Sequence, residues 1–310
     1  MKPEQSAVNV AVILTDWIDP TRDRAVPVKI YHPENVPGPL PIIIFSHGLG
    51  GSRDTYEYLG RRWASEGFVA VHLQHLGSDS AIWQTPDAAS RESLKNILLN
   101  PVNITNRTQD VSFAIDQMLR SNANNGPLRG RLNVTAVGVA GHSFGALTAL
   151  QCAGQISFRS DGTEISFTDT RVNAVVAMSS PVPESVKARA RETFAHIKVP
   201  CLHFTGTKDN GMAAPVPPEY RRIPFDHVAQ SDQYLITFKD GDHMVFTGRR
   251  VLDHRLPKDD IIHRLILDST TAFWNAYLKG DAAAKSWLAG GPFQAELAEH
   301  GVFEKKQIAP

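Results

Sequence analysis

The chain has 310 residues, which is enough for one large α/β domain or two smaller ones, and we expect a single domain over residues 1–310. Hydrophobic residues make up 42% and charged residues 21%, and 32 Lys and Arg balance 32 Asp and Glu. This composition is typical of a globular protein and gives no sign of a nucleic-acid-binding face, an acidic tail or disorder. We therefore expect a small or neutral partner molecule and no nucleic acid.

The amino terminus indicates the expected compartment, and the two cysteines have an expected place in the core. The first residues have neither the charged start nor the apolar stretch of a secretory signal, and no run reaches the ~18 apolar residues of a membrane span. We expect a soluble protein that is cytoplasmic or, if a signal peptide has been removed, secreted. Cys152 and Cys201 lie in apolar segments and are expected to be buried thiols, and the sequence leaves open whether they pair.

The chain begins with two segments of clustered β-branched residues, 8–14 and 25–31, on either side of the turn-rich stretch 16–23. This pattern predicts an antiparallel pair of strands at a sheet edge. Further strand-like runs, several of them apolar on both faces, follow at 42–45, 68–73, 132–140, 172–178, 199–205 and 233–238. Helical periodicity is expected at 55–66, 108–119, after residue 143, at 259–278 and at 282–288.

Two segments between these elements have weak periodicity. Residues 77–106 form a stretch too long for a simple connector, so we expect a partly helical flap near the functional site. Residues 211–225 contain several prolines and are expected to form a loop at the site.

The alternation of strands and helices predicts an α/β fold with a mostly parallel twisted sheet, helices on both faces and an antiparallel N-terminal edge. In such a sheet, functional groups collect beyond the carboxyl ends of the strands. Reactive side chains are therefore expected in the segments that follow the strands.

The clearest signal is the segment Gly141-His142-Ser143-Phe144-Gly145, which follows a buried-type strand and precedes a helical run. In a Gly-x-Ser-x-Gly turn the serine occupies a strained position, and the glycines are needed because side chains there would collide with the neighbouring strand and helix. The sequence thus predicts Ser143 as a catalytic nucleophile.

A serine hydroxyl needs a neutral imidazole to remove its proton and a carboxylate to orient that imidazole. His243 follows the last predicted strand on a glycine-containing loop and is the expected base. Asp209, which also follows a strand, is the expected acid and gives the chain order Ser, Asp, His. Asp240 and Asp242 are so near His243 in sequence that a solvated turn is their expected role, with Asp242 the next choice of acid.

The other histidines near strand ends are not expected to act as the catalytic base. His142 adjoins the nucleophile in sequence but lies on the opposite side of the turn, so it is expected to shape the site or pack beneath it, and it is also a candidate substrate contact. His47 is interpreted as a structural loop residue, and His72 and His75 lie at a strand end without a matching acid.

Tetrahedral addition places negative charge on the substrate oxygen, which backbone N–H groups can stabilise. Phe144, directly after the nucleophile, and Leu49, in the glycine-rich segment 46–51, are the expected donors. The glycine spacing does not match a phosphate-binding loop. No metal-ligand spacing is visible and the chemistry requires none, so we expect neither a metal nor a cofactor.

The sequence resembles the α/β-hydrolase superfamily, and within it the esterases that group platelet-activating-factor acetylhydrolases, dienelactone-hydrolase-like proteins and cutinase-like polyester hydrolases. The resemblance rests on Tyr56 and on the segments 23–31 (DRAVPVKIY), 46–53 (SHGLGGSR), 64–70 (ASEGFVA) and 141–146 (GHSFGA).

Three departures from these groups bear on the assignment. Platelet-activating-factor acetylhydrolases carry the acid after the strand that here ends in Ser179-Ser180-Pro181, so Asp209 stands one strand later. Dienelactone hydrolases proper use a cysteine where this chain has Ser143. Cutinase-like polyester hydrolases usually have a second glycine where Ala146 stands.

The resemblance and the residues together lead us to expect a serine carboxylesterase that forms an acyl-enzyme on Ser143. Trp83 in the flap and His142 are the candidate substrate contacts, and the alternative role for Trp83 is that of a packing anchor. The alternatives are an amidase, thioesterase or acyltransferase with the same triad, or a non-catalytic member of the fold that binds a ligand in the same cleft. The ester could be a small molecule or a polymer, and the sequence does not give the oligomeric state.

Overall fold

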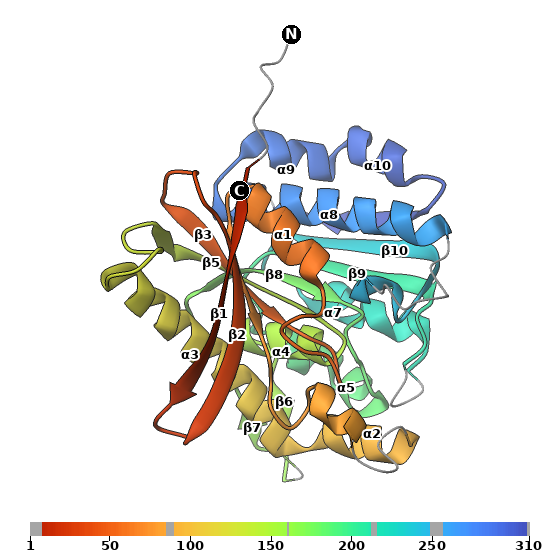
Figure 1. Cartoon of the computed structure of the whole chain (residues 1–310). Coiled ribbons are helices and arrows are strands. Elements are labelled where there is room, and N and C mark those ends of the chain that lie inside the picture. Colours follow the sequence, from red (N-terminus) through yellow and green to blue (C-terminus); the bar gives the residue numbers. More distant parts are fainter. Residues whose placement is uncertain (1–7, 85–89, 160, 212–215, 249–256, 309–310) are drawn as a thin grey trace.

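The structure is a computed structural model that describes residues 8–84, 90–159, 161–211, 216–248 and 257–308. It has the α/β-hydrolase fold, in which a nine-stranded, mostly parallel sheet carries helices on both faces (Figure 1). In the order in which they lie side by side, the strands are β1 (Val10–Asp19), β2 (Arg24–Pro33), β4 (Val69–Leu73), β3 (Leu40–Ser46), β5 (Leu132–His142), β8 (Val172–Met178), β9 (Cys201–Lys208), β10 (Gln233–Asp242) and β11 (Gly301–Lys306).

The first strands and the last strand pair antiparallel, and those between them pair parallel. The expected antiparallel N-terminal edge is confirmed, although β1 continues through Asp19, so that half of the segment interpreted as a turn is strand. Strand β11 is a missed element: the short segment Gly301–Lys306 pairs with β10 and forms the opposite edge of the sheet. A separate two-stranded hairpin consists of β6 (Ser157–Phe158) and β7 (Glu164–Ile165).

Helices bury the two faces of the sheet in separate apolar cores. One face is covered by α1 (Glu57–Ser65), α8 (Pro257–Leu278), α9 (Ala282–Ala289) and α10 (Gly291–Leu297). Here Trp63 and Trp274 meet edge to face, with ring centroids 5.9 Å apart. The other face is covered by α3 (Pro101–Ala123), α4 (Phe144–Cys152) and α6 (Ala190–Phe194).

The segment expected to form a flap is partly helical, and its role as a flap stays a prediction. Within the described residues it contains the 3₁₀ helix η1 (Ser80–Gln84), α2 (Arg91–Leu99) and the first turn of α3. Residues 85–89 of the flap and 212–215 of the expected site loop lie outside the described residues. The rest of that loop contains η2 (Pro218–Arg222) and leads into α7 (Ile223–His227). The remaining short helices are α5 (Glu184–Ala188) and η3 (Val245–Thr247).

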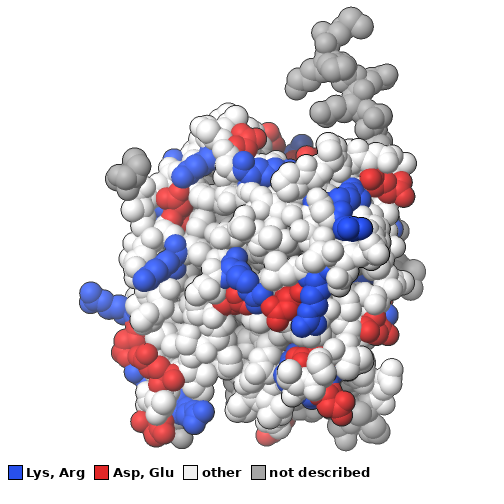
Figure 2. All heavy atoms as spheres, turned by 90° about the vertical axis from the view of Figure 1, so that its left-hand side faces the viewer, with Lys and Arg blue, Asp and Glu red and all other residues white. Residues whose placement is uncertain are grey.

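The burial of the two cysteines and the mixed charge of the surface are as expected from the sequence. Cys152 and Cys201 are both buried free thiols. Figure 2 shows basic and acidic side chains intermixed on one side of the molecule, with neutral surface between them and no broad area of a single sign. Among the helices of the described residues, none combines the length and apolar character that a membrane crossing requires.

Adjacent strands β3 and β5 end side by side, with Ser46 in register with Gly141. Helix α4 starts directly after β5, and its first turn lies against the backbone that leaves β3. At Gly145 a Cβ atom would overlap the carbonyl oxygen of Ser46, and at Gly141 it would overlap the carbonyl of Gly145. The expectation that these two glycines prevent collisions is confirmed, and the same contact brings two functional segments together.

Replacement of Gly145 by alanine tests this close approach. Because the backbone of Ser46 must move to admit the methyl group, we expect Gly145→Ala to lower the free energy of unfolding by about 1–3 kcal/mol, measured by urea denaturation. The control is Gly291→Ala, where no atom lies within 4 Å of the added Cβ. Equal stability losses in the two variants would contradict the packing.

Candidate active site

Ser143 occupies the sharp turn between β5 and α4. Its backbone has φ 54° and ψ −115°, an unfavourable region for a residue with a side chain, and its N–H donates to the carbonyl of Met178 on β8 (2.8 Å). This geometry is the strand–turn–helix context that a Gly-x-Ser-x-Gly motif requires.

The structure brings the three residues of the expected triad together. Ser143 Oγ lies 3.0 Å from His243 Nε2, and His243 Nδ1 lies 2.7 Å from Asp209 Oδ1. An ionised carboxylate only accepts hydrogen bonds, so Nδ1 is protonated and donates a hydrogen bond to Asp209. In the neutral ring Nε2 therefore has no proton and can accept that of the Ser143 hydroxyl, which is the arrangement that general-base activation of a serine requires.

The carboxylate of Asp209 is fully buried and held by several donors. Ser179 Oγ donates to Oδ1 (2.8 Å) and Thr205 Oγ1 donates to Oδ2 (3.0 Å). Arg221 Nε lies 3.5 Å from Oδ1. Burial alone would raise the pKa of Asp209, but the hydrogen bond from His243 and the charge of Arg221 lower it to about 2. Asp209 is therefore ionised at neutral pH.

Ser179 and Arg221 are site residues that the sequence did not reveal. Ser179 Oγ also lies 2.7 Å from His243 Nδ1, so it contacts both the expected base and the expected acid. Its φ of 55° is unusual for serine, and Arg221 donates to the carbonyl oxygens of Ser179 (3.1 Å) and Ser180 (3.0 Å). Serine is common at strand ends, so Ser179 gave no distinctive sequence signal. Arg221 lies in a segment interpreted only as a loop.

His142 links the nucleophile turn to two other loops. Its Nε2 donates to the carbonyl of His243 (2.9 Å), so its Nδ1 accepts from the hydroxyl of Tyr56 (2.7 Å). The Tyr56 hydroxyl in turn accepts from the N–H of Gly48 (3.4 Å). Burial, together with the nearby His243, holds the pKa of His142 well below its ordinary value and keeps the ring neutral. Both ring nitrogens are thus engaged within the protein, and its contact with substrate stays a prediction.

The two expected oxyanion-hole donors lie on the segments that Gly145 brings together. Phe144 is the first residue of α4, so its N–H has no acceptor in the helix itself. Leu49 lies in the turn after β3, where Gly51 N–H donates to the Gly48 carbonyl (3.0 Å) and Gly50 N–H to the Ser78 carbonyl (2.9 Å). Their role in binding an oxyanion stays a prediction.

Ser143 and His243 open into a cavity of about 810 Å³. Trp83, one of the expected substrate contacts, lines this cavity, is 45% exposed and donates its indole N–H to the Gly50 carbonyl (2.8 Å). Other apolar lining residues are Leu49, Leu94, Leu98, Val216 and Met244. A second part of the lining is charged and contains Asp54, Glu57 and Arg61.

One assignment to a histidine was wrong. His75, described from the sequence as having no matching acid, donates from Nδ1 to Asp110 Oδ2 (3.0 Å) and contacts Ser46 Oγ through Nε2 (2.9 Å). The acid comes from α3, a segment interpreted only as an amphipathic helix. Arg107 and Asp110 stand one turn apart on its buried face, and opposite charges on an apolar helix face are the signal that could have revealed them.

The remaining candidates have structural contacts. His47 is buried, and its Nε2 accepts from the N–H of His75 (3.0 Å). Asp242 Oδ1 accepts from the N–H groups of Met244 (2.7 Å) and Val245 (3.0 Å), in the turn expected for it.

The low pKa of Asp209 predicts a contribution to acid stability. The group's pKa rises to about 3.9 on unfolding, so its stabilising effect is complete above that pH and is lost as the pH falls towards 2. We expect the difference in free energy of unfolding between the parent and Asp209→Asn to shrink by about 2 kcal/mol between pH 5 and pH 2. Urea denaturation across this range measures it, and a difference that does not change with pH would contradict the assignment.

Comparisons with known proteins match part of the chain. The family described as platelet-activating factor acetylhydrolase, isoform II, matches residues 21–110. A platelet-activating factor acetylhydrolase from Cavia porcellus is 29% identical over 150 residues, which is 41% of this chain and 34% of that protein. A putative phospholipase A2 from Schizosaccharomyces pombe is 29% identical over 172 residues, which is 42% of this chain and 39% of that protein.

These matches each span well under half the length of the relatives. The family match includes the turn after β3 and the Arg107–Asp110 pair, and it ends before Ser143. Together with the fold, the matches show that the chain resembles serine esterases of the α/β-hydrolase type, platelet-activating factor acetylhydrolases among them.

Proposed function

We propose that the protein is a serine carboxylesterase that hydrolyses carboxylic esters through an acyl-enzyme on Ser143. The observation that carries this proposal is the continuous hydrogen-bonded chain from Ser143 through His243 to the ionised Asp209, open to a cavity at the serine end. The relatives are named as an acetylhydrolase and a phospholipase, and both names describe hydrolases.

In the acylation step, His243 Nε2 takes the proton of Ser143 as Oγ attacks the ester carbonyl. The tetrahedral intermediate collapses when the carbon–oxygen bond to the alcohol breaks and His243 returns the proton to the leaving oxygen. Water then attacks the acyl-enzyme, with His243 again as base, and the carboxylic acid leaves. Asp209 stabilises the imidazolium that forms in both steps.

The backbone N–H groups of Leu49 and Phe144 would bind the negative oxygen of both tetrahedral intermediates. This role is supported by their place on the two segments beside Ser143 and by the N–H of Phe144, which has no acceptor within α4. Their value lies in being fixed before the reaction, because loops that had to reorganise would lose most of the stabilisation.

The cavity suggests the kind of ester. Leu94 and Leu98 on α2, together with Trp83, form an apolar wall suited to a hydrocarbon portion of the substrate. The charged lining around Glu57 and Arg61 suits a polar portion. We therefore propose an ester that joins an apolar chain to a polar group.

A fluorophosphonate tests the proposal, because it phosphonylates only an activated serine. We expect one adduct, mapped to Ser143 by peptide mass spectrometry, and no adduct in Ser143→Ala. A parent protein that is not labelled, or is labelled at another serine, would overturn the assignment.

Removal of the base gives a second test. We expect His243→Ala to lower kcat on a p-nitrophenyl ester by roughly 10⁴-fold or more, because Ser143 loses its proton acceptor. The matched control is His227→Ala, an exposed histidine at the end of α7, which should retain parent activity. Matched anilides and thioesters are assayed alongside, and faster turnover of either than of the ester would change the reaction class.

Ser179 should support the triad without touching the substrate. Because its hydroxyl hydrogen-bonds both Asp209 and His243, we expect Ser179→Ala to reduce kcat by roughly 10-fold, the equivalent of about 1.5 kcal/mol, with KM little changed. Ser180→Ala, at the neighbouring buried serine, is the control and should leave kcat near the parent value. Equal activities for the two variants would exclude a role for the Ser179 hydroxyl.

A further inference from the structure

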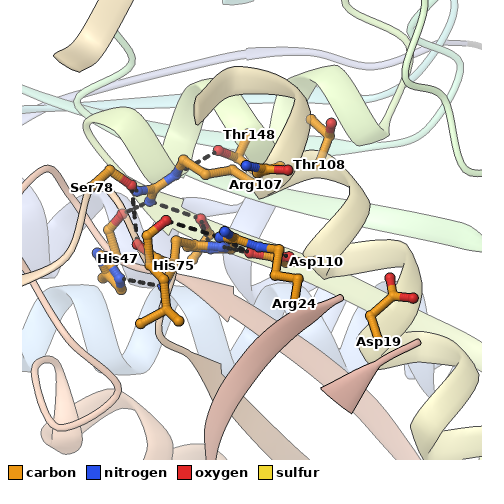
Figure 3. Close-up of polar contacts among 12 residues, drawn as sticks. Asp19, Arg24, His47, His75, Ser78, Arg107, Thr108, Asp110 and Thr148 are labelled. Atoms are coloured by element: carbon orange, nitrogen blue, oxygen red, sulfur yellow. Dashed lines mark hydrogen bonds and ion pairs between the residues drawn. The ribbon is translucent and has the colours of Figure 1, made fainter. Parts of the chain in front are cut away.

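A buried polar cluster lies behind the turn that carries Leu49, on the opposite side from the cavity. Figure 3 shows Arg107 between Ser78 and Thr148, with His47, His75 and Asp110 beside it and Arg24 reaching in from β2. Arg107, His75 and Asp110 are each 0% exposed. The cluster does not line the cavity around Ser143, so substrate does not reach it there.

Arg107 contacts both segments that carry the expected oxyanion-hole donors. Its Nη2 donates to the backbone carbonyl of His47, two residues before Leu49. On the other side its guanidinium lies 4.3 Å from the ring centroid of Phe144, and its Nε donates to Thr148 on α4 (3.3 Å). One side chain on α3 therefore joins the turn after β3 to the start of α4.

The remaining donors of Arg107 hold the base of the same turn. Nη2 also donates to Ser46 Oγ (3.2 Å), and Nη1 donates to Ser78 Oγ (2.8 Å). The backbone of Ser78 in turn accepts the N–H of Gly50, the residue after Leu49. Arg107 thus contacts Ser46 and His47 directly, before Leu49, and is connected through Ser78 to Gly50, after it.

Ser46, His75 and Asp110 form a second Ser–His–Asp chain, with Ser46 Oγ 2.9 Å from His75 Nε2 and His75 Nδ1 3.0 Å from Asp110. All three are 0% exposed, so this chain is closed to a substrate and its serine accepts a hydrogen bond from Arg107. Its contacts orient Ser46 instead, directly before the His47 carbonyl. Asp110 is itself fixed by Arg24, whose Nε lies 2.9 Å away.

A buried guanidinium is costly unless its donors are satisfied, and the four acceptors of Arg107 are all uncharged. Burial lowers the pKa of Arg107 to about 9, which still leaves the group protonated at neutral pH. A planar fork with several donors can satisfy four acceptors around it, whereas the ammonium of lysine cannot match that geometry.

We propose that Arg107 is a positioning residue for the oxyanion hole, which fixes the Leu49 and Phe144 N–H groups relative to each other from behind. This inference rests on the proposed function of Ser143 and extends it to a residue that does not touch substrate. Misplacing such donors by a fraction of an ångström weakens their bonds to the developing oxyanion while leaving the proton-transfer chain intact.

The test compares Arg107→Met and Arg107→Lys with the parent. We expect Arg107→Met to lower kcat on a p-nitrophenyl ester by roughly 10²-fold, with KM changed by less than about 3-fold and the pH dependence of kcat/KM unaltered. The affinity for a trifluoromethyl ketone, whose adduct with serine carries the oxyanion, should fall by a similar factor. Arg107→Lys should recover only part of the loss, because its ammonium lacks the guanidinium fork.

A readout that needs no activity separates this inference from the proposed function. Hydrogen exchange of the peptide spanning residues 46–52 should be at least roughly 10-fold faster in Arg107→Met, because the turn loses its anchor. If the parent neither hydrolysed esters nor reacted with the fluorophosphonate at Ser143, the proposed function would be rejected. The faster exchange in Arg107→Met would still show that Arg107 anchors the turn.

The control is Arg171→Met. Arg171 also binds α3, through Asp116 (2.5 Å) and the Ser112 carbonyl (3.2 Å), and its other hydrogen bonds to described residues go to Asp169, away from the turn after β3. We expect it to keep parent kcat. A folded Arg107→Met protein with kcat within about 3-fold of the parent and unchanged exchange at 46–52 would overturn the inference.

Ser78→Ala provides a second test of the inference if Arg107→Met does not fold. It removes the acceptor of Arg107 Nη1 together with the longer hydrogen bond from Ser78 Oγ to the His75 carbonyl (3.3 Å), and should lower kcat by roughly 3- to 10-fold, mainly through the lost hydrogen bond to a charged group. If that variant has the parent kcat and the parent affinity for the trifluoromethyl ketone, Arg107 does not position the hole and the inference is rejected.

Discussion

The contact between the first turn of α4 and the backbone that leaves β3 is the constraint on which the site depends. Gly145 permits this contact because any side chain there would overlap the carbonyl of Ser46. As a result, the segment after the nucleophile and the segment that carries Leu49 lie against each other at the end of adjacent parallel strands. The same packing that stabilises the sheet therefore places the candidate nucleophile beside both candidate oxyanion donors.

Two polar networks stabilise the contact between the start of α4 and the turn after β3. On the cavity side, Tyr56 and His142 connect Gly48 to the backbone of His243. The turn after β3, the turn that carries Ser143 and the loop after β10 are therefore linked by hydrogen bonds. On the far side, Arg107 of α3 binds the His47 carbonyl directly, and Asp110 of α3 is connected to Ser46 through His75. Buried hydrogen-bonded networks of this kind restrict motion more than apolar packing alone, because each hydrogen bond has a preferred direction.

The sequence revealed the parts of the site that follow local rules. The glycines around Ser143 and the strand ends before Asp209 and His243 could be identified because backbone geometry and parallel topology require them there. The supporting residues could not be found in this way. Ser179 lies next to Asp209 and His243 only through tertiary contacts, and His75 meets Asp110 from 35 positions away. Strand β11 was missed because its six residues form a strand only by pairing with β10.

The measurement that tests the central claim most directly is the trapping of the acyl-enzyme during turnover. The protein is mixed with a slowly deacylated p-nitrophenyl ester, quenched in acid within the steady state, and analysed by intact mass and peptide mapping. We expect one acyl group per chain, attached to Ser143, together with a burst of one equivalent of p-nitrophenol. Steady turnover with no acyl group on Ser143, or with the acyl group on another residue, would contradict this expectation.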